Sequence, residues 1–283
     1  MSSPGGAGRG TTKDGSDEAP PPQALSVVLA DLHIHTVLSP CAEAEMIPPL
    51  IVQRALDVGL GLIAITDHNA AANCPAVIKA AAGTELAVLP GMEVQTSEEV
   101  HVVCLFDTSE QALTWQGIVF NHLPDLPNRE EHFGAQFIVD AFGDYVRTES
   151  RLLATSVDLT LEDAVHRVND LGGIAIPAHV DRPGYSLLAN LGFVPPDLKA
   201  PALELFRLTR VADARARWPE LATWPLIRSS DAHQLSEIDP SIRLNIGGRT
   251  VSELAMALRR QEGRSFSLVS RHRPLPRPLP AAP

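Results

Sequence analysis

The chain has 283 residues, of which 45% are hydrophobic and only 5% aromatic, so a large aliphatic core is expected. Its 34 acidic and 23 basic residues give a formal net charge of −11, which disfavours a protein that follows a nucleic-acid backbone by bulk electrostatics but leaves room for a local basic pocket. Three widely spaced cysteines and the lack of a long apolar stretch exclude a disulfide-rich secreted domain and a membrane-spanning helix. We therefore expect a cytoplasmic protein.

The two ends of the chain differ in composition from the rest. Residues 1–24 are rich in Gly, Ser, Pro and charged residues, which predicts a disordered tail. Residues 271–283 read RHRPLPRPLPAAP, and this Pro-rich pattern is more typical of an extended terminus than of a ligand for a partner. We predict one folded domain over residues 25–270, with no membrane contact and no evident protein partner.

Short apolar runs alternate with helical stretches from residue 27 onward. In chain order the pattern predicts a strand, a helix, a strand, a helix and a strand over residues 27–35, 47–59, 60–69, 71–82 and 86–94. A further buried strand is expected at 100–106 and a helix at 108–123. Residues 136–150 contain a Gly-Asp turn between two extended runs, which predicts an inserted β-hairpin.

The alternation resumes at Thr160, which begins a helix as a capping box with Asp163. The remaining pattern predicts strands over 173–180, 203–209, 225–233, 243–248 and 266–270, with helices over 160–173, 211–221 and from Thr250. Such alternation predicts a mostly parallel sheet with right-handed crossovers, and about seven units suffice to close an α/β barrel. A doubly wound open sheet is the alternative.

Imidazole and carboxylate side chains recur at the C-terminal ends of the predicted strands. They are His33, His35, Asp67, His68, Glu93, His179, Asp231 and His233. In an α/β barrel this edge builds the active site. Residues two apart in a strand point to the same side, so the pairs 33/35 and 231/233 are each suited to chelation. One such pair is more often structural, but the repetition at equivalent strand ends favours a metal cluster of Zn, Mn or Fe(II).

Five motifs carry a resemblance to a known family. They are DLHIHT, ITDHN, GMEVQT, IPAHVDRP and SSDAH, in this order. Together they resemble the polymerase and histidinol phosphatase (PHP) superfamily, and residues 27 to 269 are similar to its stand-alone phosphoesterase branch. The resemblance implies a distorted (β/α)7 TIM-like barrel, here with the inserted β-hairpin, and two or three divalent Zn, Mn or Fe ions.

The resemblance also implies three groups of ligands: His33, His35, Glu93 and Asp231 around a first metal, Glu93, His101 and His179 around a second, and His68 with His233 around a third. Cys41 stands where many relatives carry His or Asp. Thiolate is a good ligand for Zn or Fe(II) and a poor one for Mn. We therefore expect Cys41 to ligate the third metal; a weak third site is the alternative.

These residues predict hydrolysis of a phosphate ester by a metal-bridging hydroxide, since neither a G-x-S-x-G motif nor a P-loop occurs. Glu93 and Asp231 are expected to act through the metals, and Asp67 to orient a ligand or shuttle a proton. Candidates for binding phosphate are Arg182 first, then Arg207 and Arg243, although each could instead form a surface ion pair.

The expected substrate is the phosphate monoester of a small molecule, such as a nucleotide, sugar or amino-alcohol phosphate. A nuclease or nucleotide-end-processing phosphodiesterase is the alternative, and the acidic net charge makes nucleic acid the less expected partner without excluding it. A non-catalytic, metal-stabilised module is the third reading, which the nearly complete ligand set disfavours.

Overall fold

The computed structural model describes residues 1–2 and 24–269. The predicted tails at 1–24 and 271–283 thus lie almost wholly outside the described residues, and the domain limits 25–270 stay a prediction. The strands are β1 (Ser26–Ile34), β2 (Leu62–Ile65), β3 (Ala87–Gln95), β4 (His101–Leu105), β5 (Phe137–Val139), β6 (Tyr145–Thr148), β7 (Ile174–Pro177), β8 (Leu203–Leu205), β9 (Leu226–Arg228), β10 (Ile242–Ile246) and β11 (Ser265–Leu268). The α-helices are α1 (Pro48–Asp57), α2 (Cys74–Ala80), α3 (Ser109–His122), α4 (Glu130–Phe133), α5 (Leu161–Asp170), α6 (Leu187–Asn190), α7 (Val211–Arg217) and α8 (Val251–Leu258).

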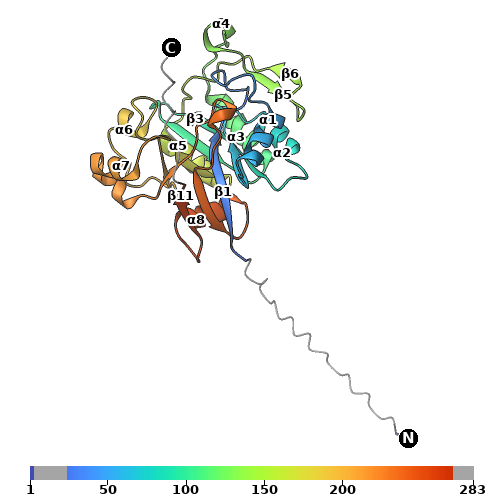
Figure 1. Cartoon of the computed structure of the whole chain (residues 1–283), viewed down its shortest axis with the longest axis vertical. Helices are drawn as coiled ribbons and strands as arrows, with labels where there is room; N and C mark the ends of the chain where they lie inside the picture. The colour runs from blue at the N-terminus through green and yellow to red at the C-terminus, as the bar shows by residue number, and fades with distance from the viewer. Residues whose placement is uncertain (3–23, 270–283) are drawn as a thin grey trace, which may run out of the picture.

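Seven strands form one mixed sheet in the order β11-β10-β1-β2-β3-β4-β7. Figure 1 shows α1 and α2 to the right of β1, α6 and α7 to its left, and the β5–β6 hairpin with α4 at the top. β1, β2 and β3 are parallel to one another, whereas β4 and β10 are antiparallel to their neighbours. The chain is thus a mixed α/β fold with a curled sheet.

The prediction of a mostly parallel sheet is wrong for β4 and β10, which run antiparallel to their neighbours, and the exact (β/α)7 arrangement is not confirmed. β4 follows β3 through a tight turn in which Thr96 N–H donates to the Val100 carbonyl (2.9 Å). A connection this short cannot make the crossover that parallel strands need. Apolar runs identify buried strands but carry no information on strand direction.

The parallel pair β8–β9 is joined by backbone hydrogen bonds to the residues that follow β7 and to the end of β1. Val180 N–H, just after β7, donates to the Glu204 carbonyl of β8 (2.8 Å). Ala232, just after β9, exchanges backbone hydrogen bonds with His33 and His35 (3.2 and 3.0 Å). These bonds bring the carboxyl ends of β7, β8, β9 and β1 together at one edge.

Helix starts follow local sequence signals. The Thr160 side chain accepts a hydrogen bond from Asp163 N–H at the start of α5, and Thr250 from Glu253 N–H at the start of α8, as predicted. Thr108 and Gln111 form a full capping box at the start of α3. Such caps satisfy backbone donors that the first turn of a helix leaves free.

The sheet buries apolar side chains on both of its faces. Adjacent residues of β2 belong to different clusters: Ile63 packs with Met92 and Trp115, whereas Leu62 packs with Leu89 among residues that include α8. Burial on both faces explains why these strands are continuous apolar runs in the sequence. The polar residues of the sheet therefore concentrate at the strand ends.

The hairpin β5–β6 is antiparallel and is tied to the loop that follows β1. Phe137 N–H donates to the Val37 carbonyl (3.0 Å). Asn73, fully buried, donates to the Phe137 carbonyl (3.0 Å) and accepts from Val139 N–H (3.0 Å). Within residues 1–2 and 24–269, none of the helices combines the length and hydropathy that crossing a bilayer requires.

Candidate metal centre

The site begins where β1 ends. The pairing of β1 with β2 shifts register between Asp31 and Ile34, and Leu32 and Ile34 consequently pack in different core clusters. A local irregularity of this kind re-aims side chains. His33 and His35 both emerge at the carboxyl edge, fully buried, with ring centroids 5.1 Å apart.

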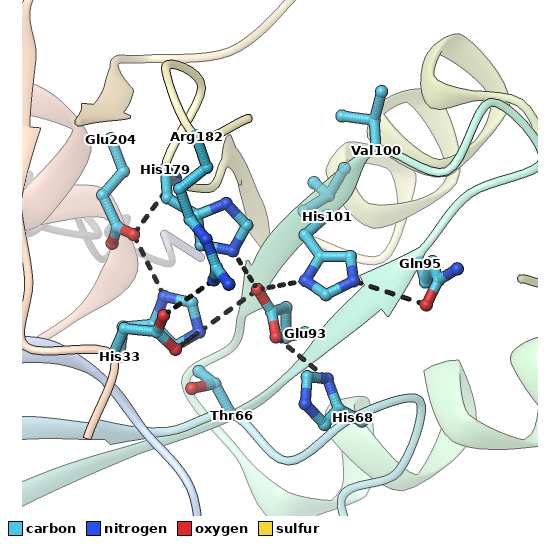
Figure 2. A network of polar contacts seen from close by, with 12 residues as sticks. His33, Thr66, His68, Glu93, Gln95, Val100, His101, His179, Arg182 and Glu204 are labelled. Carbon is cyan, nitrogen blue, oxygen red and sulfur yellow. Dashed lines mark hydrogen bonds and ion pairs between the residues drawn. The ribbon is translucent and has the colours of Figure 1, made fainter. Parts of the chain in front are cut away.

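Glu93, near the end of β3, lies at the centre of the cluster (Figure 2). Its Oε1 is 2.9 Å from His101 Nδ1, 3.0 Å from His179 Nε2 and 3.3 Å from His33 Nε2. Its Oε2 is 3.0 Å from His68 Nδ1, although this contact does not meet hydrogen-bond geometry. One carboxylate thus contacts imidazoles from four separate segments.

The reversal of β4 explains how His101 reaches this edge. His101 is the first residue of β4 and pairs with Gln95 at the end of β3. Because the strands are antiparallel, the start of β4 lies beside the end of β3. The resemblance placed His101 in the cluster, and the fold supplies the physical reason.

Two further residues of the cluster adopt left-handed backbone conformations. His179 has φ 29° and Asp231 has φ 52°, a region that costs energy for residues other than glycine. Asp231 Oδ1 lies 3.5 Å from His33 Nε2 and 3.4 Å from His35 Nε2, and its Oδ2 is 3.2 Å from Arg182 Nη1. The strain is found where the chain turns to aim these side chains into the site.

Asp67 lies beneath the cluster and does not line the cavity among the described residues. Its buried carboxylate accepts hydrogen bonds from the Thr36 N–H, the Thr36 hydroxyl and the Ser39 hydroxyl, each 2.7 Å long. Because the Ser39 hydroxyl donates its hydrogen bond to Asp67, the Ser39 oxygen accepts a hydrogen bond from His35 Nδ1 (2.9 Å). Asp67 thus fixes the ring of His35 through Ser39.

The arrangement fits a cation. His35 Nδ1 donates to Ser39, and His33 Nδ1 lies 3.1 Å from a side-chain oxygen of Glu204 that accepts its hydrogen, so each Nε2 carries the lone pair when its ring is neutral. Those two Nε2 atoms lie 3.1 Å apart. Acceptors at this distance repel each other unless positive charge lies among them. Burial opposes charge on His33, but the surrounding carboxylates outweigh it and raise its pKa well above the usual value, so the site stabilises positive charge at this point.

The pKa shifts of Glu93, Asp231 and His35 favour metal-binding forms. Burial raises the pKa of Glu93, but the imidazoles of His101 and His33 outweigh it and hold the pKa well below its usual value. The pKa of Asp231 is also lowered, because His33 and His35 outweigh burial. Burial, reinforced by nearby imidazoles, lowers the pKa of His35 well below its usual value. Ionised carboxylates and a neutral imidazole are the forms that ligate divalent ions.

A second part of the cluster joins His35, His68 and His233, whose nearest ligand atoms lie within 4.8 Å of one another. The rings of His35 and His233 are stacked with centroids 4.1 Å apart. Cys41 is exposed when the whole residue is considered, but its thiol lies against His233 and His68. Burial of the thiol raises its pKa, and the hydrogen bonds with His233 and His68 outweigh this effect and lower the pKa to about 6. The structure thus brings Cys41 beside the two histidines with which sequence reasoning grouped it.

Above the cluster lies a cavity of about 510 Å³. Arg182 and Arg207 line it, and Arg207 is paired with Glu237 (2.8 Å). Arg243 does not line the cavity. It is exposed on β10, opposite Leu29 of β1. Because β10 is antiparallel to β1, its residues run away from the edge that holds the site, which corrects the expectation for Arg243.

Sequence reasoning missed Glu204. This residue of β8 is buried, and its Oε1 also accepts from His179 N–H (3.3 Å). The available signal was a carboxylate between two leucines of an apolar strand, since a buried charge needs a partner. Tyr185 and Phe206, which line the cavity, carried no such signal.

A buried carboxylate surrounded by imidazoles at the carboxyl edge of a curled α/β sheet is an arrangement able to bind metal ions. The model of the PHP domain matches residues 31–158. Residues 31–158 are therefore similar to the PHP domain, and the His and Glu clusters of the chain are able to bind metal ions.

Two kinds of relative resemble the chain. The 5'-3' exoribonuclease Rnm of Salmonella typhimurium is 36% identical over 83 residues, which are 28% of this chain and 27% of that protein. The endonuclease PfuEndoQ from Pyrococcus furiosus has a similar fold, with a TM-score of 0.62 and 22% identity over 85% of this chain and 58% of that one. Endonuclease Q in complex with a 27-mer duplex gives a TM-score of 0.59 and 20% identity, with the same coverage of both chains. The chain therefore spans only part of each relative.

These comparisons contradict the expected partner. A small phosphorylated molecule was predicted, with nucleic acid less expected, but the relatives are by name a ribonuclease and an endonuclease. The net charge was a poor guide because it averages over the whole surface, whereas a phosphate would meet only the residues that line the cavity, which include two arginines and a cluster suited to cations beside three carboxylates. Local charge decides whether a phosphate is attracted.

Proposed function

We propose that this chain is a metal-dependent phosphoesterase that hydrolyses phosphodiester bonds in nucleic acid. The observation that carries the proposal is the convergence of six imidazoles and two carboxylates beneath an open cavity with arginines on its wall. Imidazole and carboxylate ligands suit Zn, Mn or Fe(II). We propose two or three such ions, since these ligands exceed what one ion uses.

The proposed ligands follow the contacts of Glu93. His33, His35 and Asp231 would hold one ion with Glu93, and His101 with His179 would hold a second. His68, His233 and Cys41 would hold a third. Such ions supply an activated water and offset the negative charge of the phosphoryl group.

The remaining residues would position these ligands and the substrate. Asp67, through Ser39, and Glu204, directly, fix the rings of His35 and His33. Hydrogen bonds of this kind set which ring nitrogen is free to ligate. Arg182, held 3.2 Å from Asp231, would contact a phosphate oxygen, and Arg207 would do so after leaving Glu237.

Nucleic acid is proposed as the substrate because the relatives with sequence and fold similarity include nucleases. An open cavity agrees with a polymer whose chain must enter and leave. The acidic net charge is no obstacle where arginines and bound cations face the phosphate. We therefore place the chain among phosphodiesterases.

The test is a cleavage assay with the metal-loaded protein. Single-stranded and duplex RNA and DNA oligonucleotides are incubated beside a panel of phosphorylated metabolites, with Zn, Mn or Fe(II) supplied in turn. We expect shortened oligonucleotides and slower release of phosphate from metabolites. Hydrolysis of a metabolite with every oligonucleotide left intact would contradict the proposal.

A further inference from the structure

The loop that follows His179 presents a cation and an aromatic ring to the same cavity. Arg182 N–H donates to the His179 carbonyl (3.0 Å), and the Ser186 hydroxyl donates to the Arg182 carbonyl (2.6 Å). Ser186 also begins α6, where its side chain accepts from Ala189 N–H. The loop is therefore fixed at both ends, and both Arg182 and Tyr185 line the cavity.

Tyr185 is unusual in three respects. Its φ is 54°, a conformation disfavoured for an aromatic residue. One face of its ring is stacked on His101, with centroids 5.2 Å apart and planes 29° apart. The residue is nevertheless 48% exposed and lines the cavity. An aromatic residue held in a strained conformation and only partly covered resembles a surface built for a planar ligand.

The cavity limits what that ligand is. Its volume of about 510 Å³ lies in the range typical of sites for a single small ligand. A base pair with both of its backbones is much larger than one nucleotide. The volume therefore favours an unpaired nucleotide at the site, either in a single strand or turned out of a duplex.

We propose that Tyr185 is a stacking platform for the base of one unpaired nucleotide, whose phosphate faces Arg182 and the cluster. The inference rests on the proposed function and adds the form of substrate that the site takes. Stacking is tolerant of sequence because every base has a flat face. The platform thus selects nucleotides over abasic phosphodiesters without reading a sequence.

The experiment compares two single strands that differ only in their bases. One is an ordinary oligonucleotide, and the other carries an abasic sugar at every position, so both contain the same phosphodiester bonds. For the wild-type, metal-loaded protein we expect kcat/KM to be about 5- to 150-fold higher with bases present. Tyr185→Asn should bring this ratio close to one, and Tyr185→Phe should retain it. Asn accepts a positive φ, so the backbone of the loop is kept.

Phe142→Asn is the matched control, because Phe142 is 74% exposed and does not line the cavity among the described residues. It should keep the wild-type ratio. An unchanged ratio in Tyr185→Asn, or a wild-type ratio near one, overturns the platform while leaving the proposed function intact. Cleavage of neither strand by the wild type overturns the proposed function, and this inference with it.

A binding measurement checks the same contact without turnover. Stacking quenches the fluorescence of a 2-aminopurine nucleotide, so wild type and Phe142→Asn should quench it on binding. Tyr185→Asn should not. Equal quenching by all three proteins overturns the platform.

Discussion

Glu93 contacts more of the cluster than any other described residue in it, with His33, His68, His101 and His179 all within 3.3 Å of its oxygens. We expect Glu93→Gln to lower kcat/KM by more than about 100-fold, the upper end of losses from changing outer contacts of a metal site. The core packs apart from this side chain, so the fold should persist. Metal content, kcat/KM and thermal unfolding are measured on one preparation. Loss of the fold at ambient temperature would count against the role.

Substitution of Glu204 tests whether the residues that contact the proposed metal ligands, here His33, contribute to metal affinity. Glu204→Gln keeps an acceptor for His33 Nδ1 but removes the charge that helps to raise the pKa of His33. Affinity for the metal should fall about 10- to 100-fold, as measured by competition with a chelator. Glu253→Gln is the control, because Glu253 is also buried but pairs with Arg264 elsewhere. Equal effects of both substitutions would refute a specific role for Glu204.

Cys41 tests the third metal. Cys41→Ser should lose one metal equivalent, because a hydroxyl is a poor ligand. Cys41→Asp should keep the ion and shift preference from Zn or Fe toward Mn, because carboxylate is the harder ligand. Elemental analysis after loading with mixed metals measures both. The same stoichiometry and preference in all three proteins would leave Cys41 without a role in metal binding.

At the scale of elements, Asn73 joins α2, the hairpin β5–β6 and the loop after β1. Its side chain contacts the Thr36 hydroxyl, the Phe137 carbonyl and Val139 N–H. Asn73→Ala leaves these buried groups without that partner, which should cost about 1 to 3 kcal/mol of unfolding free energy. Hydrogen exchange should rise in residues 136–139 in particular.

Asn190→Ala controls for the loss of an amide, because Asn190 also donates two hydrogen bonds to backbone carbonyls but in an exposed place. It should leave exchange in the hairpin unchanged. Faster exchange spread evenly over the protein in Asn73→Ala would mean that Asn73 stabilises the whole fold rather than this junction.

Strands and helix starts could be predicted because their signals are local. Thr160 and Thr250 cap the helices that their sequences indicate, and the apolar runs are strands. Strand direction could not be predicted, since it depends on the length of connections and on which edges are free. β4 shows the difference: it was placed correctly along the chain, yet it runs antiparallel to β3.

At the scale of the whole molecule, the proximity of the candidate ligands was the most predictable part of the site. The histidines and carboxylates lie in short contiguous motifs that can be recognised in the sequence. The structure brings them within a few ångströms of one another. Arg243 was wrongly expected at the site, and Glu204 was missed. The direction of β10 carries Arg243 away from the cluster, and the position of β8 brings Glu204 to it, and neither can be read from the sequence. The substrate was misjudged because a net charge of −11 does not describe one cavity.

We propose that the buried cluster binds metal ions and that the hydrolysis of nucleic acid requires them. The most direct measurement removes the metals with a chelator, counts them by elemental analysis, and assays oligonucleotide cleavage before removal, after it and after metal is returned. We expect two or more equivalents per chain, loss of cleavage on removal, and recovery with Zn, Mn or Fe(II). Cleavage at an unchanged rate by the metal-free protein would contradict the account.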